Sequence, residues 1–388
     1  MVYRINGKRN RLEVLLSSLF FFACILHYFS RRPLWLDEIS LFDNIKNLNY
    51  SELFGPLRHA QAFPRVYLAV IKAVAGIFDY HVLALRFFSL VSMLAAYIVW
   101  REVFKNIFGR SWGYLLAVAA MTGSYYFSYY SAEFKAYATD VLVAGIFCLF
   151  WMRTQRWETG EISRKDYVLS GLLAFSVFIS YMAAFFVPAL GWRMGVLALR
   201  QKTLRPLCVF YSFWAVTVLV VLYFVDVRFA VGDKSLMAYW DSYCLCTTSA
   251  GCFGGTFWEG LRRLSTVWYG KEKIFIRTAS FLIPIFIYSL VRHGFMAWVK
   301  EKFSLRSLET LGTFIFVELF ILGLLHKFPF TGERITLFFA PFVIIFIIRG
   351  ILDLTQGFRP LGYAVAMGWS ALLLCAYINT VSIFLRLY

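Results

Sequence analysis

The stretch LEVLLSSLFFFACILHYF occupies residues 12–29, and SRRPLWLDE follows it at residues 30–38. An apolar run of this length matches the roughly 17–25 residues that a helix needs to cross a bilayer. We expect this first span to be retained, because Ser30-Arg31-Arg32-Pro33 is a poor signal-peptide cleavage site. The chain therefore enters a membrane near its first residues, and an adjacent acidic pair, Asp37 and Glu38, follows the span directly.

The composition extends this interpretation to the whole chain. Its 388 residues are 60% hydrophobic and only 16% charged, whereas a soluble domain carries about 25% charged residues. A soluble core could not cover so much apolar surface, but lipid can. No polar linker divides the sequence, so we expect one transmembrane domain over residues 1–388. The net charge of +17 lies in short clusters between apolar runs, which indicates membrane lipid as a partner and not nucleic acid.

The apolar runs predict an all-α polytopic membrane protein with a bundle of about eleven transmembrane helices. The segment 64–78 is also apolar, but its Arg65 and Lys72 favour an interfacial helix over a further span. The expected spans lie near residues 12–29, 83–100, 112–129, 136–151, 167–181, 183–199, 207–225, 277–291, 310–325, 335–350 and 362–384.

Basic residues predict the orientation of these spans. With the N-terminus in the cytoplasm, the short cytoplasmic loops hold the basic clusters, as the positive-inside rule requires. The first outer loop is then residues 30–82, the second large one is residues 226–276, and the C-terminus lies outside. The cytoplasmic clusters are Arg101, Lys105 and Arg110; Arg153, Arg156, Arg164 and Lys165; Arg193, Arg200, Lys202 and Arg205; Arg292, Lys300, Lys302 and Arg306.

Asp37 and Glu38 are the first candidates for chemistry. In a partly dry crevice at the membrane surface, one of two neighbouring carboxylates can act as a general base. The two can instead hold a divalent metal ion, or lie in an ordinary solvated loop. His59, in the same outer loop, can serve as a ligand, a base or a hydrogen-bond donor to phosphate, or can be a polar surface residue.

Further ionisable residues lie at the outer ends of predicted spans. Arg86 can bind a substrate phosphate or extend to lipid headgroups. Glu133, Lys135 and Tyr137 open another span, where Glu133 and Tyr137 share a helix face; they form either an interfacial anchor or a binding site.

Lys327 and Arg334 flank the outer loop between the 310–325 and 335–350 spans. At this interface the low dielectric would strengthen their contact with a phosphate, although anchoring in the interface explains them as well. Under the predicted orientation, all of these groups face the same side of the membrane.

Three cysteines share the second large outer loop. If this loop faces an oxidising compartment, one pair among Cys244, Cys246 and Cys252 can form a disulfide and leave one free thiol. Their spacing lacks the paired C-x-x-C pattern of a zinc site, and the loop offers no histidine beside them, so metal binding is the less favoured interpretation.

In their order, these motifs resemble those of polytopic GT-C glycosyltransferases that use lipid-phosphate-linked sugars, in particular bacterial members of the protein O-mannosyltransferase and aminoarabinose-transferase-like group. The resemblance covers about residues 12–350. It rests on Trp35-Leu36-Asp37-Glu38, the proline-started segment from Pro64, Leu85-Arg86-Phe87-Phe88-Ser89, Ser131-Ala132-Glu133-Phe134-Lys135-Ala136-Tyr137, and Lys327-Phe328-Pro329-Phe330 with Arg334 and Pro341. Lys135 stands where an arginine is more frequent in the family, and Phe63-Pro64 where many relatives have two prolines.

The resemblance implies an inverting transfer from a polyprenyl-phosphate-sugar donor to an envelope glycan, lipid or protein outside the cytoplasmic (inner) membrane. Asp37 would be the general base, and Glu38 would support it or bind a divalent metal. Arg86, Lys135 and Arg334 would hold the departing lipid phosphate. Acceptor recognition would fall to residues 226–276.

Two other classes of protein compete with this interpretation. A transporter or flippase of a lipid-linked intermediate would place ionisable residues at the bilayer midplane and show matching halves; the predicted spans are nearly free of charge and no repeat is visible. A non-catalytic membrane scaffold would not need the acidic pair.

Overall fold

Helices are the only regular secondary structure in the part of the chain that the computed structural model describes. That part is every residue except 1, 31, 267–269, 271, 331, 333 and 388, and for residues 2–9 and 266 it includes only the backbone. Within it, 8 helical segments are long and apolar enough to cross a membrane, which confirms the all-α expectation and supports a multi-pass membrane protein. They are Asn10–Phe29, Val82–Phe108, Tyr137–Thr159, Ala183–Arg200, Lys202–Gly232, Leu282–Lys300, Leu337–Gly357 and Arg359–Leu385.

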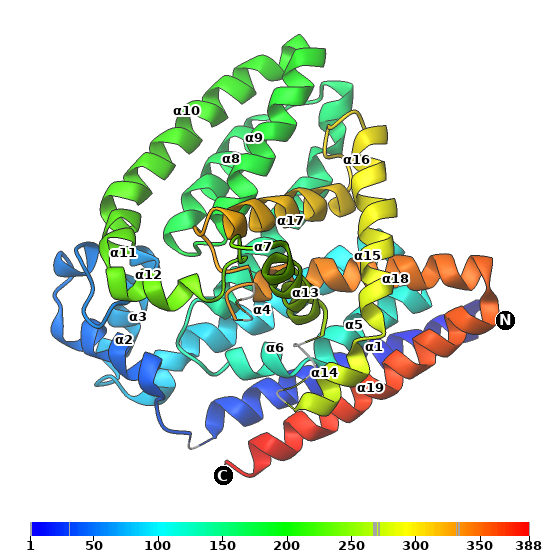
Figure 1. Cartoon of the computed structure of the whole chain (residues 1–388), viewed down its shortest axis with the longest axis horizontal. Coiled ribbons are helices and arrows are strands. Elements are labelled where there is room, and N and C mark those ends of the chain that lie inside the picture. Colours follow the sequence, from blue (N-terminus) through cyan, green and yellow to red (C-terminus); the bar gives the residue numbers. More distant parts are fainter. Residues whose placement is uncertain are drawn as a thin grey trace.

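These segments contain the long helices of Figure 1. Two of the segments continue through a π-helical stretch, at Tyr223–Val227 and at Leu290–Phe295. The helices are α1 (Val2–Phe29), α4 (Val82–Phe108), α7 (Tyr137–Arg153), α9 (Ala183–Arg200), α10 (Arg205–Leu222) with α11 (Arg228–Gly232), α15 (Leu282–Ser289) with α16 (Met296–Lys300), α18 (Ala340–Gly357) and α19 (Arg359–Leu385).

The other three predicted spans do not form helical segments of the 18 residues or more that the eight have. The 112–129 run breaks at Ser124 into α5 (Trp112–Gly123) and α6 (Tyr125–Tyr130), because Ser124 adopts an extended backbone conformation. The 167–181 run contains α8 (Arg164–Phe175), followed by a 3-10 turn over Ser176–Phe178. The 310–325 run forms α17 (Leu308–Leu324), which has 17 residues and includes Glu318. Helix length therefore supports eight of the eleven predicted spans.

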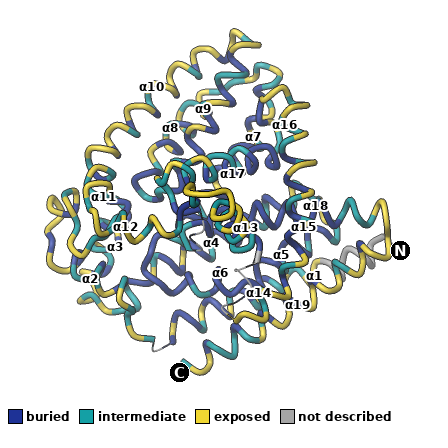
Figure 2. Tube along the Cα trace, viewed as in Figure 1, coloured by how far each residue is buried: buried dark blue, intermediate teal, exposed yellow. Residues whose placement is uncertain are grey.

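The buried core runs through the middle of the bundle, and apolar residues also cover its outside. In the most apolar stretch of the Leu337–Gly357 segment, 78% of the residues are buried, and in that of Tyr137–Thr159 the share is 67%. Helices α18 and α7 are therefore central. In the corresponding stretch of Lys202–Gly232, only 22% of the residues are buried, and Figure 2 shows α10 largely exposed. Helix α10 exposes apolar side chains such as Phe213 and Val209. Exposing them to water would cost free energy, whereas contact with lipid would not.

The first outer loop folds as a small helical unit with its own buried cluster. Its helices α2 (Leu36–Asn47) and α3 (Arg65–Ile77) pack together beside α4, around Leu41, Tyr67 and Leu68. Helix α3 has 13 residues, about 20 Å, which is too short for a span. Arg65 pairs with Asp226 at 2.9 Å and Lys72 donates to the Ile45 carbonyl at 2.6 Å, so each cation contacts a group of the protein.

The second outer loop is also largely helical, and its longest helix, α13 (Ala250–Thr266), lies near the middle of the view in Figure 1. The loop also contains α12 (Lys234–Asp241) and α14 (Lys273–Ala279). The Leu245 amide donates to the Gly323 carbonyl at 3.2 Å, and the Phe257 ring lies 5.6 Å from that of Phe320, so the loop is fastened to α17. The predicted disulfide is present as Cys246–Cys252, with Cys244 as the free thiol.

Candidate functional site: an aromatic cleft beside Asp37

The acidic pair occupies the first turn of α2, where the helix dipole favours negative charge. Neighbouring residues of a helix point about 100° apart, so two adjacent carboxylates cannot share one environment. The Glu38 side chain is fully buried, whereas that of Asp37 is 31% exposed. The two acids therefore have different roles in the structure.

Glu38 holds the start of α2 in place. One carboxylate oxygen accepts from Arg86 Nη2 at 2.9 Å and the other from Arg86 Nε at 3.2 Å, which forms a two-point ion pair. Arg32 Nη2 adds a contact at 3.3 Å, and the amides of Trp35 and Phe134 donate at 3.3 and 3.1 Å. Both oxygens are saturated, so Glu38 does not fit the predicted role of a metal ligand beside Asp37.

Arg86 is committed to the same network. Besides Glu38, its guanidinium donates to the carbonyls of Arg32 at 3.0 Å and Pro33 at 3.3 Å, and the residue is fully buried. This arrangement ties the Arg32-Pro33 turn to α4. In this structure Arg86 therefore positions α2 and is not open to a substrate phosphate, in contrast to the predicted role.

Asp37 lies between two cations that come from distant parts of the sequence. Its Oδ2 accepts from Arg334 Nη1 at 2.8 Å and lies 3.9 Å from Lys135 Nζ. Lys135 is 4% exposed; it donates to Gln61 Oε1 at 3.2 Å and sits 4.8 Å from the centre of the Phe63 ring. The structure thus brings Asp37 together with Lys135 and Arg334, two of the three cations that the resemblance assigned to the lipid phosphate.

The Arg334 guanidinium lies between aromatic rings. Its Cζ is 5.0 Å from the Trp35 ring centre and 5.9 Å from that of Trp240, while Nη2 donates to the Tyr239 hydroxyl at 3.2 Å. Stacking on tryptophan holds the planar cation in position without neutralising it. Among the described residues, the Asp37 carboxylate provides the counter-charge.

A cleft of about 280 Å³ opens in front of Arg334, between α6 and the second outer loop. Seven aromatic side chains dominate its walls, together with one acid and two arginines. The lining residues are Trp35, Tyr126, Tyr129, Tyr130, Tyr239, Trp240, Tyr243, Glu133, Arg263, Gly332 and Arg334. Aromatic faces with a few charged groups suit a ligand that has both apolar faces and polar edges.

Glu133 is the acidic group of the cleft wall. It is 1% exposed, and neither of its carboxylate oxygens has a hydrogen-bond partner among the residues described. Burial, and next the negative charge of Glu38, raise the pKa of Glu133 from 4.5 to about 7, although Arg32, Lys135 and Arg334 oppose this rise. Glu133 can therefore exchange a proton near neutral pH.

The raised pKa of Glu133 predicts a pH-dependent stability difference. The folded chain binds this proton more tightly than the unfolded chain between pH 4.5 and about 7, so its stabilising contribution is full below pH 4.5 and is lost as the pH rises. We expect wild type to lose up to about 3 kcal/mol relative to Glu133→Gln over this range. Melting temperatures of both proteins in detergent, measured in pH steps, check this; a pH-independent difference would contradict it.

The remaining predicted residues lie at different places. Tyr137 stacks edge-on against the cleft residue Tyr130, with ring centres 4.8 Å apart, and so supports the cleft wall. His59 pairs instead with Asp43 at 3.0 Å on the exposed side of α2. Lys327 is exposed and makes no side-chain ion pair with the described residues. Arg31, Thr331 and Glu333 of the quoted motifs lie outside the described part of the chain.

The aromatic wall was missed in the sequence. Tyr125, Tyr126, Tyr129 and Tyr130 form a visible run, but tyrosines near a membrane surface are common interfacial residues. The spacing of Tyr126 and Tyr130 places both on one helical face, which could have indicated a shared surface. The contribution of Tyr239 and Trp240 depends on how the second outer loop folds back, which no local pattern indicates.

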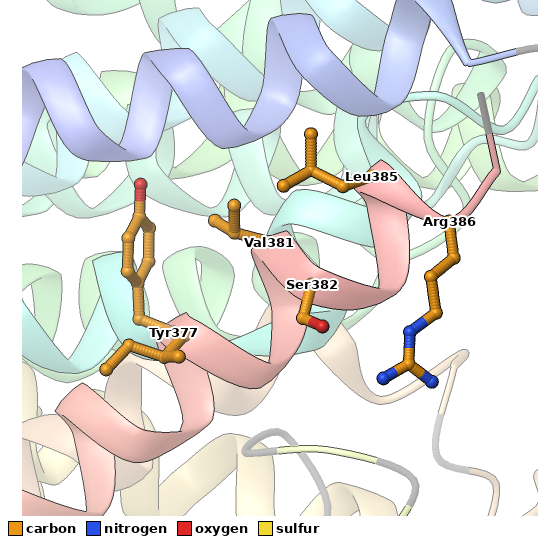
Figure 3. A pocket seen from close by; sticks show the side chains of 6 residues that line it. Tyr377, Val381, Ser382, Leu385 and Arg386 are labelled. Carbon is orange, nitrogen blue, oxygen red and sulfur yellow. The ribbon is translucent and has the colours of Figure 1, made fainter.

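A second hollow lies along the outside of α19 and is drawn in Figure 3. It measures about 450 Å³ and is lined only by side chains from Tyr377 to Arg386 of this one helix. The Tyr377 hydroxyl turns away to the Leu19 carbonyl at 2.9 Å. This groove is mostly apolar, and Ser382 and Arg386 are its other polar lining residues.

The fold and the position of the charged groups define the class: an α-helical, multi-pass membrane protein with an aromatic, cation-bearing cleft between α6 and the loop of residues 226–276. No family model matches the chain, and no curated protein matches it.

Proposed function

We propose that the chain is a membrane glycosyltransferase that moves a sugar from a polyprenyl-phosphate donor to an envelope acceptor outside the cytoplasmic membrane. One observation carries the proposal: the partly exposed Asp37 carboxylate contacts Arg334 and Lys135 beside a cleft walled by aromatic rings. A base, a pair of phosphate-binding cations and stacking surfaces are the groups that glycosyl transfer from a lipid phosphate requires.

Each group has a defined part in the transfer. Asp37 accepts the proton of the acceptor hydroxyl, whose oxygen attacks the anomeric carbon of the sugar while the bond from that carbon to the phosphate oxygen breaks. Arg334 and Lys135 stabilise the negative charge on the departing lipid phosphate. In the ligand-free chain these cations neutralise Asp37; when they bind phosphate they release it as a base. The aromatic walls stack on the apolar faces of the sugar.

The two outer helical units suit a donor with a lipid tail. The cleft lies between α6, which directly precedes the α7 span, and residues of the second outer loop. A polyprenyl chain can stay in the bilayer while its phosphate reaches Arg334. The second outer loop, through Tyr239, Trp240 and Tyr243, then faces the acceptor side of the cleft.

The test is a direct search for the product and the leaving group. The purified full chain, reconstituted in lipid vesicles with a polyprenyl-phosphate hexose and an envelope lipid extract, is expected to release free polyprenyl phosphate. It should also yield an acceptor heavier by one sugar, detected by mass spectrometry. Movement of the intact donor across the vesicle membrane, without cleavage, would contradict a transferase and indicate a transporter. Envelope extracts unchanged between cells with and without the chain would also contradict the proposal.

A further inference from the structure

The free thiol of the second outer loop lies in a cluster of three possible metal ligands. Asp241 ends α12, Cys244 follows it by three residues, and His326 comes from the loop after α17. One ligand atom of each residue lies within 4.8 Å of the other two, and His326 Nδ1 is 2.6 Å from Asp241 Oδ1. The histidine that the loop itself lacks is therefore supplied by tertiary folding.

The Cys244 thiol is positioned by the fold and is not part of the disulfide. Cys246 and Cys252 pair with each other, which leaves Cys244 as the free cysteine of this loop. Cys244 is buried, and among the described residues its sulfur makes two long contacts, to the Trp240 carbonyl at 3.7 Å and the Phe328 carbonyl at 3.6 Å. A sulfur with two weak contacts can turn toward a cation at little cost.

The chemistry of the three donors selects the cation. One thiolate sulfur, one imidazole nitrogen and one carboxylate oxygen match borderline-soft divalent metals and suit zinc best, whereas Ca²⁺ and Mg²⁺ prefer oxygen alone. Zinc bonds of about 2.0–2.3 Å set tetrahedral ligand atoms roughly 3.3 Å or more apart, so His326 Nδ1 and Asp241 Oδ1, now 2.6 Å apart, would separate as the ion enters between them. A fourth tetrahedral position would remain for water. The exposed Asp241 carboxylate provides the open side through which an ion can enter.

We propose that Asp241, Cys244 and His326 bind a Zn²⁺ ion that fastens the second outer loop to the end of α17. The Cys244 thiol gives its proton to solvent as the metal binds. Tyr239, Trp240 and Tyr243 of the cleft wall alternate with the ligands Asp241 and Cys244 in the sequence, so the ion stabilises the wall that carries the Arg334 contacts. The role is structural and does not depend on the proposed transferase activity.

Metal content of the purified chain tests the site. After chelation and reloading with Zn²⁺, the full chain in detergent is expected to hold about one zinc ion after gel filtration. Cys244→Ser and His326→Ala should each weaken zinc binding by at least about 100-fold. His293→Ala is the matched control, because His293 also pairs with an aspartate, Asp353 at 2.9 Å, but belongs to no such three-ligand cluster in the described residues. A wild type that holds no zinc, or a Cys244→Ser variant that keeps it, would overturn the proposal.

Two further measurements distinguish a specific site from loosely bound zinc. Loading with Co²⁺ should produce a sulfur-to-cobalt charge-transfer band that is present in His293→Ala and absent in Cys244→Ser. Zinc should also slow maleimide labelling of Cys244, located by mass spectrometry, by about tenfold or more in wild type and in His293→Ala, but not in His326→Ala. Equal protection of Cys244 in all three proteins, or in none of them, would reject the assignment. Because none of these measurements requires turnover, their failure would leave the proposed function untouched.

Discussion

Asp37→Asn is expected to reduce sugar transfer by about 10²- to 10⁴-fold, while the protein still inserts in the membrane and folds. Asparagine keeps the shape of the side chain but cannot take a proton from the acceptor hydroxyl. The stability cost should stay small, because Asp37 is 31% exposed and its ion pairs are partly solvated. Initial rates of polyprenyl phosphate release, compared with the melting temperature of the same preparation, separate the two effects.

Asp43→Asn is the matched control for this change. Asp43 lies on the same helix, is 33% exposed, and also pairs with cations, Arg58 and His59. It contacts none of the groups around the cleft that carry the proposed mechanism. We expect transfer by Asp43→Asn to remain within about twofold of wild type. Equal activity of Asp37→Asn and wild type would contradict the assignment of Asp37 as the base.

Glu38→Gln, one residue further along, is expected to give the opposite result: a large loss of stability, by about 3–5 kcal/mol. The change leaves the buried Arg86 charge without its carboxylate and turns an amide group toward the guanidinium. The first turn of α2 and the Arg32-Pro33 segment depend on the same network, so the cleft should lose its shape along with the fold. Thermal unfolding in detergent and the yield of monodisperse protein measure the effect.

Glu102→Gln provides the comparison for the same chemical change at an exposed site. Glu102 is 46% exposed and pairs with Lys105 at 3.0 Å within one helix, a contact worth at most about 0.5 kcal/mol. Its melting temperature should stay close to that of wild type. If Glu38→Gln were as stable as Glu102→Gln, the buried ion pair with Arg86 would not be holding the structure.

The helical spans show where sequence patterns were sufficient. Long apolar runs predicted eight segments that the structure places in helices of membrane length. The pattern failed at 112–129 and 167–181, because apolarity alone does not reveal a backbone break. At Ser124 the chain turns to begin α6, which carries three of the cleft tyrosines. The position of these tyrosines in the candidate site therefore depends on a helix break that apolarity does not predict.

For the polar residues, the sequence could indicate a common side of the membrane but not the role of each residue. The sequence indicated that Asp37 and the cations Arg86, Lys135 and Arg334 face one side of the membrane. In the structure Asp37 contacts Lys135 and Arg334. The sequence could not separate the roles of Arg86 and Arg334, since both are arginines at the ends of apolar runs. Arg86 is fully buried against Glu38, whereas Arg334 lies between two tryptophans at an open cleft.

The sequence by itself determined the class of protein, because hydrophobicity is a local property that adds up along each stretch of chain. It also indicated the acids and cations that are candidates for chemistry, and three cysteines of which one pair could form a disulfide. The tertiary structure alone decided which carboxylate is anchored and which is free, where the aromatic wall stands, and that His326 meets Cys244. The role of an ionisable group depends on its neighbours in space and on their dielectric, and here one decisive neighbour, Arg334, lies 297 residues from Asp37 in the chain.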